Sequence, residues 1–469
     1  MSVITRDTEA ALTPTRQAAK LPAALLILLY FTGVFAPLLT ALIFGKHGRE
    51  SFVYESGLSI ALVGFALLLI QFVLASRAKW LDRHFEMGRV YQFHRAMGII
   101  AGVLLLTHPL LLAAGRGGGP LLIGLQQPLY VWLGRGALLA LVLMAVQAAF
   151  RARLHLEYQK WQISHSLLSA AILVSGFLHV MQAGGDWKLA AMKVLWFLLA
   201  GAAVLAYAWR RFGLPRFLKK QAYWVTDVRQ EAAGVFTVSV APPPGVPVPD
   251  YLPGQYQYLT FRRDGQPAEE HPFTLSSSAT QPGVLSSMIK GFGDFTKTIG
   301  ETRPSDAVLA DAPYGRFSYL LHPDEESLVF LAGGIGMTPF ISMLRHLRGT
   351  RTAKKVLLLY ANQTEADIAF REELAAMEAA DAPSLSVRHF LSRPGDGWQG
   401  EKGRITEDML HRLVPDISGK GFYLCGPLLF IQGLAGALHE RDVPAGRIYY
   451  ESFSQQGSVR CRPRFACEP

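Results

Sequence analysis

Six apolar segments in the first half of the chain constrain its fold more than any other feature. They run over residues 22–44, 55–76, 92–114, 129–150, 161–182 and 188–209. A helix that crosses a bilayer needs about 20 predominantly apolar residues, and each segment is near that length. The first segment begins too far from the N-terminus, and is too long, for a cleaved signal peptide. The sequence therefore predicts a six-helix, all-α transmembrane bundle over 22–210, preceded by a cytoplasmic segment over 1–21.

The basic residues of the short loops predict how this bundle is oriented. Lys and Arg gather before the first segment, between the second and third, between the fourth and fifth, and after the sixth. Under the positive-inside rule these loops, and both termini, lie in the cytoplasm. The net charge of +10 is then explained by orientation and by attraction to anionic lipid headgroups, not by nucleic-acid binding. We expect a multi-pass protein of the cell membrane, in a bacterial inner membrane, that needs the lipid bilayer and no protein partner.

The cysteine content limits the redox cofactors that the chain can hold. The three cysteines are Cys425, Cys461 and Cys467. Three thiols cannot form a disulfide framework, and they are one short of the four that an iron–sulfur cluster normally needs. A redox cofactor in this protein is therefore expected to be a flavin or a haem.

Two pairs of histidines lie inside the apolar segments, His94 and His108 in the third, His165 and His179 in the fifth. The members of each pair are fourteen residues apart, which in an α-helix is a rise of about 21 Å and a return to nearly the same face. The third and fifth segments run in the same direction, so His94 should lie level with His165 and His108 with His179. One intramembrane histidine is more often an interior residue or part of a proton path. Two pairs with one spacing favour two stacked bis-imidazole sites, suited to two b-type haems.

Small residues accompany these histidines. Gly98, Ala101 and Gly102 follow His94, and Gly176 precedes His179. Residues of this size would leave room for a porphyrin, and they equally allow two helices to pack closely. The sequence leaves both interpretations open.

From about residue 220 the apolar runs shorten to the length of strands. Strands are expected over 223–228, 235–241, 256–261 and 284–290, with a further strand at His271-Pro272-Phe273-Thr274. Short strands separated by Pro and Gly turns predict a small antiparallel β-barrel over 220–322. After Lys290, a glycine-rich turn leads into a short helix over 295–299, whose free N–H groups suit a pyrophosphate.

Beyond residue 325 strands alternate with helices. A strand over 328–331 leads through a glycine-rich turn, Gly333 to Thr338, into a helix that continues to Leu347. Further strands are expected over 356–361, 386–391 and 422–425. This alternation predicts a doubly wound α/β domain over 323–453, with ligands at the carboxyl ends of its strands. The turn lacks the full G-x-G-x-x-G fingerprint and is weak evidence when taken alone.

Taken together, these motifs resemble those of the NADPH oxidase and ferric reductase family. In that family a ferric-reductase-type transmembrane haem domain is joined to a ferredoxin–NADP-reductase-like flavin module, and the resemblance covers about 22–453. It implies FAD, two b-type haems and NADPH as cofactors. The residues it assigns to FAD are His271, Pro272, Phe273, Thr274, Lys290, Gly293, Asp294, Phe295 and Thr296. Phe273 would stack on the isoalloxazine, Thr274 would bond near its reactive nitrogen, and His271 would approach the phosphates.

The same resemblance assigns residues to NADPH. They are Gly333, Gly334, Gly336 and Thr338 at the pyrophosphate, Ser392, Arg393, Lys402 and Arg404 at the 2′-phosphate, and Cys425, Gly426 and Pro427 beside the nicotinamide. Arginine is suited to the 2′-phosphate because its planar fork matches phosphate oxygens. Phe453 would cover the flavin until the nicotinamide displaces it. The residues implied to act at the reacting rings are thus Thr274, Cys425 and Phe453.

Two features depart from the family pattern. The chain continues past Phe453 into an arginine-rich tail over 454–469, which is expected to be disordered. Animal superoxide-producing members also place an Arg and a His beside the outer haem. Here Leu112 stands four residues beyond His108, and Arg116 belongs to a glycine-rich loop. Neither is a clear counterpart, which weakens the case for oxygen as the acceptor.

The resemblance implies transfer of electrons from cytoplasmic NADPH, by way of FAD and the two haems, to an acceptor on the opposite side of the membrane. The first hypothesis is an NADPH oxidase that reduces O2 to superoxide. Alternatives are a ferric or cupric chelate reductase and an electron donor to an extracytoplasmic protein. A non-redox transporter or scaffold with a regulatory nucleotide domain fits the paired histidines poorly.

Overall fold

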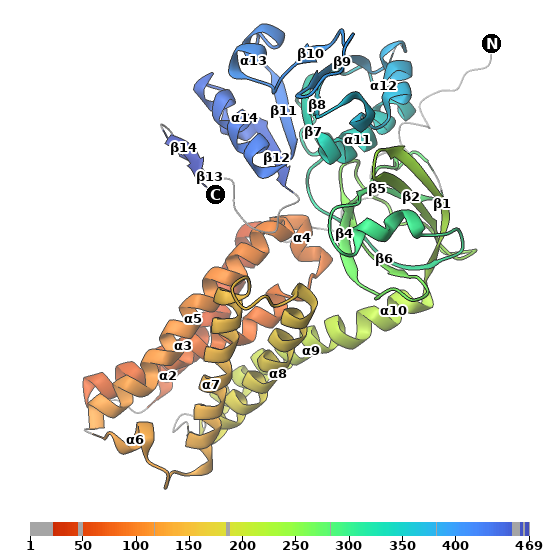
Figure 1. Ribbon diagram of the computed structural model, residues 1–469. Coiled ribbons are helices and arrows are strands. Elements are labelled where there is room, and N and C mark those ends of the chain that lie inside the picture. Colours follow the sequence, from red (N-terminus) through yellow and green to blue (C-terminus); the bar gives the residue numbers. More distant parts are fainter. Residues whose placement is uncertain are drawn as a thin grey trace, which may run out of the picture. The chain divides into compact units, whose positions relative to one another are not determined.

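The computed structural model describes residues 22–45, 50–116, 118–183, 188–281, 283–380 and 382–452, with the backbone of 460–462 and 465–468. The chain divides into two compact units, residues 1–216 and 217–469. Figure 1 shows long helices in the first unit, and strands with shorter helices in the second. Phe453, which the sequence assigns to the flavin, lies outside the described residues.

Within the described residues, six helices are long and apolar enough to cross a membrane, as predicted. They are α2 (Ala23–Phe44), α3 (Phe52–Leu74), α5 (Met87–Arg116), α7 (Leu129–Phe150), α8 (Tyr158–Ala183) and α9 (Ala190–Ala208). The π-turn η2 (Trp209–Gly213) and α10 (Leu214–Lys220) continue α9, while α4 (Lys79–Phe85) and α6 (Pro120–Ile123) are short connecting helices. Apart from its first and last turns, a helix satisfies its backbone groups internally, which is the condition for crossing lipid.

Helix α5 begins earlier than its apolar residues predict. An Asp82 carboxylate oxygen accepts the backbone N–H of Met87 at 3.2 Å, which satisfies one of the free donors at the start of the helix. Helix α3 packs against α2, α5 and α9, and α7 packs against α8. Glycines allow α3 and α5 to approach closely, since a Cβ on Gly57 would lie 3.0 Å from Leu111. The histidine-bearing helices α5 and α8 are therefore supported by α3 and α7.

The second unit begins with the predicted antiparallel β-barrel. Its strands are β1 (Tyr223–Ala232), β2 (Val235–Ala241), β3 (Tyr256–Arg262), β4 (Glu270–Thr274), β5 (Leu285–Lys290) and β6 (Ala307–Tyr314). They lie in the order β4-β3-β6-β1-β2-β5. A bridge between Leu275 and Ser287 joins the two edges and closes the sheet. The closed core contains the fully buried Val238, Leu259 and Phe261.

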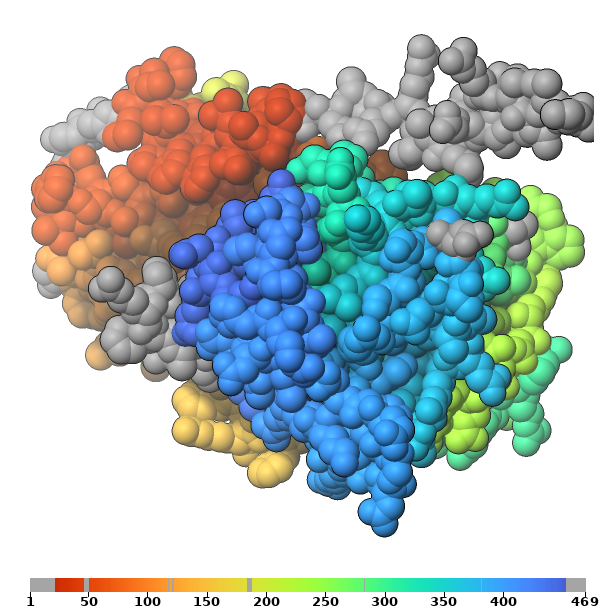
Figure 2. All heavy atoms as spheres, turned by 90° about the horizontal axis from the view of Figure 1, so that it is seen from above, coloured from red at the N-terminus to blue at the C-terminus, as the bar shows by residue number. Residues whose placement is uncertain are grey.

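The rest of this unit is the predicted doubly wound domain, with one parallel sheet in the order β10-β9-β8-β7-β11-β12. Its strands are β7 (Ser327–Gly333), β8 (Lys355–Asn362), β9 (Ser384–Leu391), β10 (Glu401–Lys402), β11 (Lys420–Gly426) and β12 (Ile448–Ser452). Helices α11 (Met337–Gly349) and α12 (Arg371–Glu378) pack on one face. Helices α13 (Glu407–Leu413) and α14 (Leu428–Glu440) pack on the other. Figure 2 shows this domain in cyan to blue, with the green barrel beside it.

Four local features differ from the sequence-based expectation. Strand β6, which lies between β3 and β1 in the barrel sheet, was not predicted. The short helix expected over 295–299 is a 3-10 helix, η3 (Thr296–Glu301). Strands β10 and β12 form both edges of the parallel sheet and were not predicted, because an edge strand needs fewer apolar residues than a central one. The tail that was expected to be disordered contains two short antiparallel strands, β13 (Arg460–Arg462) and β14 (Phe465–Glu468), whose backbone groups pair with each other.

Candidate functional site

The first histidine pair lies between two membrane helices. The imidazoles of His94 on α5 and His165 on α8 have their centroids 6.4 Å apart and their planes at 60°. A metal bonded at about 2 Å to one nitrogen of each ring would place the centroids roughly 6 Å apart. The Nδ1 atoms of both rings are buried without a hydrogen bond of normal geometry, although the Gln71 backbone lies close to His94. The spacing of the two rings fits a bis-imidazole metal site.

The second pair is held by backbone carbonyls of neighbouring helices. The Nδ1–H of His108 donates to the Gly57 carbonyl oxygen at 2.9 Å, and that of His179 donates to the Tyr130 carbonyl oxygen at 2.6 Å. Metal-binding histidines usually make this bond, which fixes the proton on Nδ1 and leaves Nε2 as the ligand atom. Gly134 gives His179 its space, since a Cβ there would lie 2.8 Å from Nδ1. The second pair is therefore oriented as metal ligands are.

The small residues between the histidines divide into two groups. No atom lies within 4 Å of a Cβ built on Gly98 or Gly102, so open space adjoins this stretch of α5. In contrast, Ala101 is fully buried, and a Cβ on Gly176 would lie 2.7 Å from the Phe65 ring. The first two positions leave room for a flat group such as a porphyrin, and the other two serve helix packing.

In the barrel, the predicted flavin residues lie on and beside β4. The His271 Nε2 is 3.0 Å from a Glu269 carboxylate oxygen, and its ring stacks on Phe295 with centroids 4.4 Å apart. Phe295 itself belongs to the barrel core and supports His271 from within. Phe273 is half-buried, Thr274 is buried, and Pro272 between His271 and Phe273 is exposed. The strand therefore presents polar and aromatic groups at the barrel surface, where a flat ring can lie on them.

In the turn that follows β5, side chains of the turn itself accept several of the backbone N–H groups. The Thr296 hydroxyl accepts the N–H groups of Phe292 and Gly293 at 3.0 and 3.1 Å, and Asp294 accepts the N–H of Phe295 at 2.9 Å. These are among the amides that the sequence assigns to a pyrophosphate. A phosphate bound at this turn would have to share the first two amides with Thr296 or displace its side chain.

A cavity in the second unit brings together residues predicted for the two cofactors. It is lined by Val235, Met288, Lys290, Gly334, Ile335, Tyr360, Asn362, Asp367 and Ala369. Lys290 ends β5 of the barrel, and Gly334 belongs to the turn after β7. The cavity has a volume of only about 20 Å³, so it shows that the segment assigned to FAD and the segment assigned to NADPH lie next to each other.

The turns after β7 and β11 meet at the switch point of the parallel sheet, where such domains bind ligands. A Cβ on Gly336 would lie 2.1 Å from the Cys425 carbonyl oxygen, and one on Gly333 would lie 3.1 Å from Pro427. A Cβ on Gly426 would lie 3.1 Å from the Cα of Gly333. At Gly336 only glycine permits this approach, so the predicted pyrophosphate turn and the predicted nicotinamide turn lie directly against each other.

Two predicted side chains of this site, Cys425 and Thr338, are buried in the protein interior. Cys425 is fully buried, and burial, with the nearby Glu451 charge, raises the pKa of its thiol well above the usual value. The thiol is therefore neutral at physiological pH and is not a nucleophile. Thr338 is buried and donates its hydroxyl to the Ile335 carbonyl oxygen at 2.8 Å, which closes the first turn of α11.

The predicted 2′-phosphate residues gather at the carboxyl ends of β9 and β10. The N–H of Arg393 donates to the Gln363 carbonyl oxygen at 2.8 Å, and Lys402 on β10 pairs in register with Leu391 of β9. The side chains of this group are exposed, at Ser392, Arg393, Lys402 and Arg404. Three adjacent cations at the ligand edge of the sheet suit a phosphate group.

Three protein families match the chain in this order. Residues 60–176 match the ferric reductase like transmembrane component, 225–318 match an FAD-binding domain, and 330–435 match an oxidoreductase NAD-binding domain. The three matches follow the bundle, the barrel and the parallel sheet. The chain therefore joins a ferric-reductase-like transmembrane domain to FAD-binding and NAD-binding oxidoreductase domains, the arrangement of a ferric-reductase/NADPH-oxidase-type fusion.

Several proteins are similar to the soluble module at 25–30% sequence identity. The flavohemoprotein of Bordetella pertussis is 30% identical over 254 residues, which are 50% of this chain and 61% of that protein. NADH-cytochrome b5 reductase 2 of Rattus norvegicus is 30% identical over 223 residues, 41% of this chain and 80% of the relative. The FAD/NAD-binding domain of a nitric oxide dioxygenase from Vibrio cholerae has a TM-score of 0.45 at 25% identity, over 50% of this chain and 98% of that one.

One charged residue of this ferric-reductase-type bundle escaped the sequence analysis. Arg135 lies inside α7, next to Gly134 and therefore at the level of His179. Its guanidinium donates to the Gly124 carbonyl oxygen at 2.8 Å and lies 4.8 Å from the centre of the Trp132 ring. An ionisable residue within an apolar segment is the signal that would have identified it. Arg116, in contrast, forms an exposed ion pair with Glu50 at 2.6 Å.

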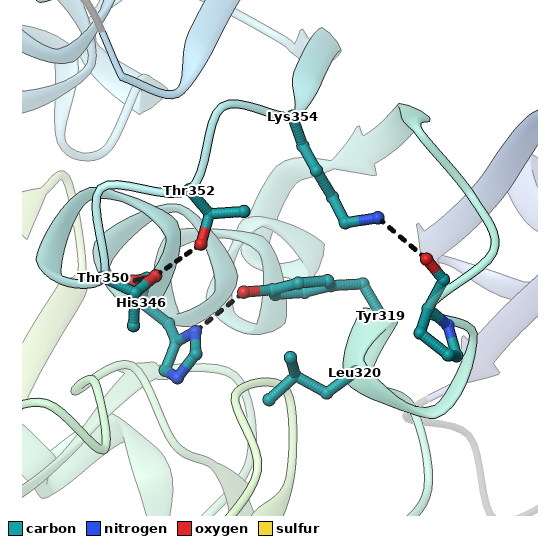
Figure 3. Close-up of a pocket in the computed structure, with 7 residues that line it drawn as sticks. Tyr319, Leu320, His346, Thr350, Thr352 and Lys354 are labelled. Carbon is teal, nitrogen blue, oxygen red and sulfur yellow. Dashed lines mark hydrogen bonds between the residues drawn. The ribbon is translucent and has the colours of Figure 1, made fainter. Parts of the chain in front are cut away.

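Another cavity in the described part of this unit has a volume of about 240 Å³, and none of the residues predicted to bind a cofactor lines it. Its lining residues are Tyr319, Leu320, Pro323, His346, Thr350, Thr352 and Lys354 (Figure 3). The Tyr319 hydroxyl and His346 Nδ1 are 2.7 Å apart. Burial lowers the pKa of His346 and raises that of Tyr319. Because this cavity lies at the end of α11 and before β8, it is at the opposite edge of the sheet from the glycine turns.

Proposed function

We propose that the chain transfers electrons from cytoplasmic NADPH to an acceptor on the opposite side of the membrane, with FAD and two b-type haems as its cofactors. The observation that carries the proposal is the arrangement of the four histidines, two on α5 and two on α8, in a chain that also contains FAD- and NAD-binding domains. We propose O2 as the acceptor, with superoxide as the product.

When bound, FAD accepts a hydride and releases electrons singly, and haem iron carries one electron at a time. His94 and His165 would hold one haem, and His108 and His179 would hold the other. The Gly57 and Tyr130 carbonyls keep the second pair in the tautomer that offers Nε2. If both histidines of each pair held a haem, the acceptor would be reduced without binding to the metal.

The basic loops support an orientation with both termini in the cytoplasm, and the nucleotide-binding domain follows the last span on that side. A bacterial inner membrane is the proposed location. The exposed cations at Arg393, Lys402 and Arg404 support NADPH over NADH, because the two nucleotides differ only by the 2′-phosphate.

Reduction of a ferric or cupric chelate is the second candidate, supported by the match of residues 60–176 to the ferric reductase like transmembrane component. The deciding experiment is to purify the protein in detergent, supply FAD and NADPH, and follow haem absorbance with and without O2. Superoxide formed at the rate of NADPH loss, and removed by superoxide dismutase, is the result expected of an oxidase. Fast turnover only with ferric chelate would favour the second candidate, and slow turnover with both would favour a protein acceptor.

A further inference from the structure

Helix α11 connects the two cofactor-binding parts of the second unit. It starts directly after the glycine turn of β7, and its side packs on the barrel segment that follows Thr274. The Ser342 hydroxyl donates to the Ser277 carbonyl oxygen at 2.6 Å. The Arg345 Nη1 donates to the Ser276 carbonyl oxygen at 2.8 Å. The helix therefore binds the backbone of Ser276 and Ser277, two and three residues beyond Thr274, which is assigned to the flavin ring.

Arg345 is also fixed from its other side. Its Nε and Nη2 donate to the two carboxylate oxygens of Glu373 on α12, at 2.8 and 2.6 Å. The guanidinium lies 4.9 Å from the centre of the Phe370 ring. The Arg345 side chain is only 13% exposed, so this fork is shielded from water and from salt. A two-point, charge-assisted contact fixes direction as well as distance, which lysine cannot do.

The bound segment is itself rigid within the barrel. Ser276 and Ser277 are buried, and the Ser276 N–H donates to the Ser286 carbonyl oxygen at 2.8 Å. The Ser277 hydroxyl accepts the Ser286 N–H at 3.1 Å and lies 2.8 Å from the Tyr251 hydroxyl. Displacement of this segment would break its contacts with β5 and with Tyr251. A stiff path therefore runs from β4, through Arg345 and α11, to the glycine turn at 333–336.

We propose that Arg345, assisted by Ser342, is a positioning residue that sets the distance between the flavin strand and the nucleotide turn. The inference rests on the proposed transfer from NADPH to FAD. In that transfer the hydride leaves the nicotinamide with its electron pair and adds to the flavin, so NADPH is oxidised as FAD is reduced. The reacting atoms must lie about 3–3.5 Å apart, and a misplacement of about 1 Å can cost roughly 100-fold in rate.

The test is anaerobic stopped-flow reduction of the flavin in the full-length holoprotein over a range of NADPH concentrations. We expect Arg345→Lys to lower the limiting rate by about 10-fold or more, and Ser342→Ala to lower it less, with the dissociation constant of NADPH and the FAD content within about two-fold of wild type. Arg412→Lys is the control, because Arg412 also binds both carboxylate oxygens of a glutamate, with its Nη2 2.8 Å from each oxygen of Glu401, within the α/β domain alone. An unchanged limiting rate in Arg345→Lys, or a loss confined to affinity or FAD content, overturns the proposal.

A second measurement separates this inference from the proposed function. Amide hydrogen exchange in the same proteins reports local opening without any turnover. We expect Arg345→Lys to speed exchange at 276–278 and 333–336, with Arg412→Lys unchanged there. If the wild-type protein fails to reduce FAD with NADPH, the proposed function is wrong, and the exchange data still decide whether Arg345 holds the two parts together. Equal exchange in Arg345→Lys and wild type would show that it does not.

Discussion

The two units of the molecule position their candidate cofactor sites by different means. In the membrane unit the site is made of four side chains, two each on α5 and α8, and neighbouring backbone groups only orient them. In the soluble unit the site is made largely of backbone, at turns where Gly333, Gly336 and Gly426 let segments approach closely. The difference teaches where function is visible in a sequence. A histidine in an apolar helix stands out, whereas backbone groups are common to all residues and only glycine marks them.

The largest expected effect tests the side-chain site. His108→Leu should remove about half of the haem absorbance, because one of two proposed irons loses an axial ligand. The measurement is the pyridine haemochrome content of the purified protein. His155→Leu, at an exposed loop position of the same unit, is the control and should keep full haem content. Full haem content in His108→Leu would contradict the proposed pairing.

The corresponding test of the backbone site is Gly336→Ala. Its Cβ would lie 2.1 Å from the Cys425 carbonyl oxygen, so the two turns must separate. We expect a loss of about 1–3 kcal/mol in the free energy of unfolding, as for overpacked cores, together with loss of NADPH binding. Gly433→Ala on α14, where no atom lies within 4 Å of the new Cβ, should be tolerated. Normal NADPH binding by Gly336→Ala would show that this contact is dispensable.

Arg393→Ala asks whether the soluble site also depends on individual side chains. Loss of a charge-assisted bond to phosphate should weaken NADPH binding by about 10- to 100-fold and leave NADH binding nearly unchanged. Titration of nucleotide-dependent flavin reduction gives both constants. Arg348→Ala, an exposed arginine near the end of α11, is the control. Equal weakening of both nucleotides would place the 2′-phosphate elsewhere.

The smallest expected effect concerns His346, which lies outside both candidate sites. Burial lowers its pKa in the folded protein, while in the unfolded chain it titrates near about 6.5. The unfolded chain therefore binds the proton more readily, and stability falls as the pH drops through that value. His346→Gln should weaken this dependence by at most about 1.4 kcal/mol per pH unit. Thermal unfolding between pH 7.5 and 5.5 measures it, and an unchanged slope would exclude His346 as a source.

Much of the fold could be predicted because its signals are local. The six spans follow from length and hydropathy, and the pairing of His94 with His165 follows from helix geometry. The carbonyl partners of His108 and His179 come from α3 and α7, and depend on how those helices are rotated, which no spacing encodes. Arg345 was equally invisible. A charged residue in an amphipathic helix is normally solvated, and only the packing of α11 between the barrel and α12 makes it a link.

Cys425 has a practical consequence. It is fully buried at the end of β11, and the raised pKa of its thiol keeps the reactive thiolate scarce. Alkylating reagents can reach such a sulfur only during transient opening of the surrounding structure. The rate at which a peptide containing Cys425 becomes alkylated therefore measures the rate of local opening at the glycine turns. Since mass spectrometry separates this peptide from those of Cys461 and Cys467, the alkylation rate of Cys425 can be measured in the wild-type protein without introducing a label.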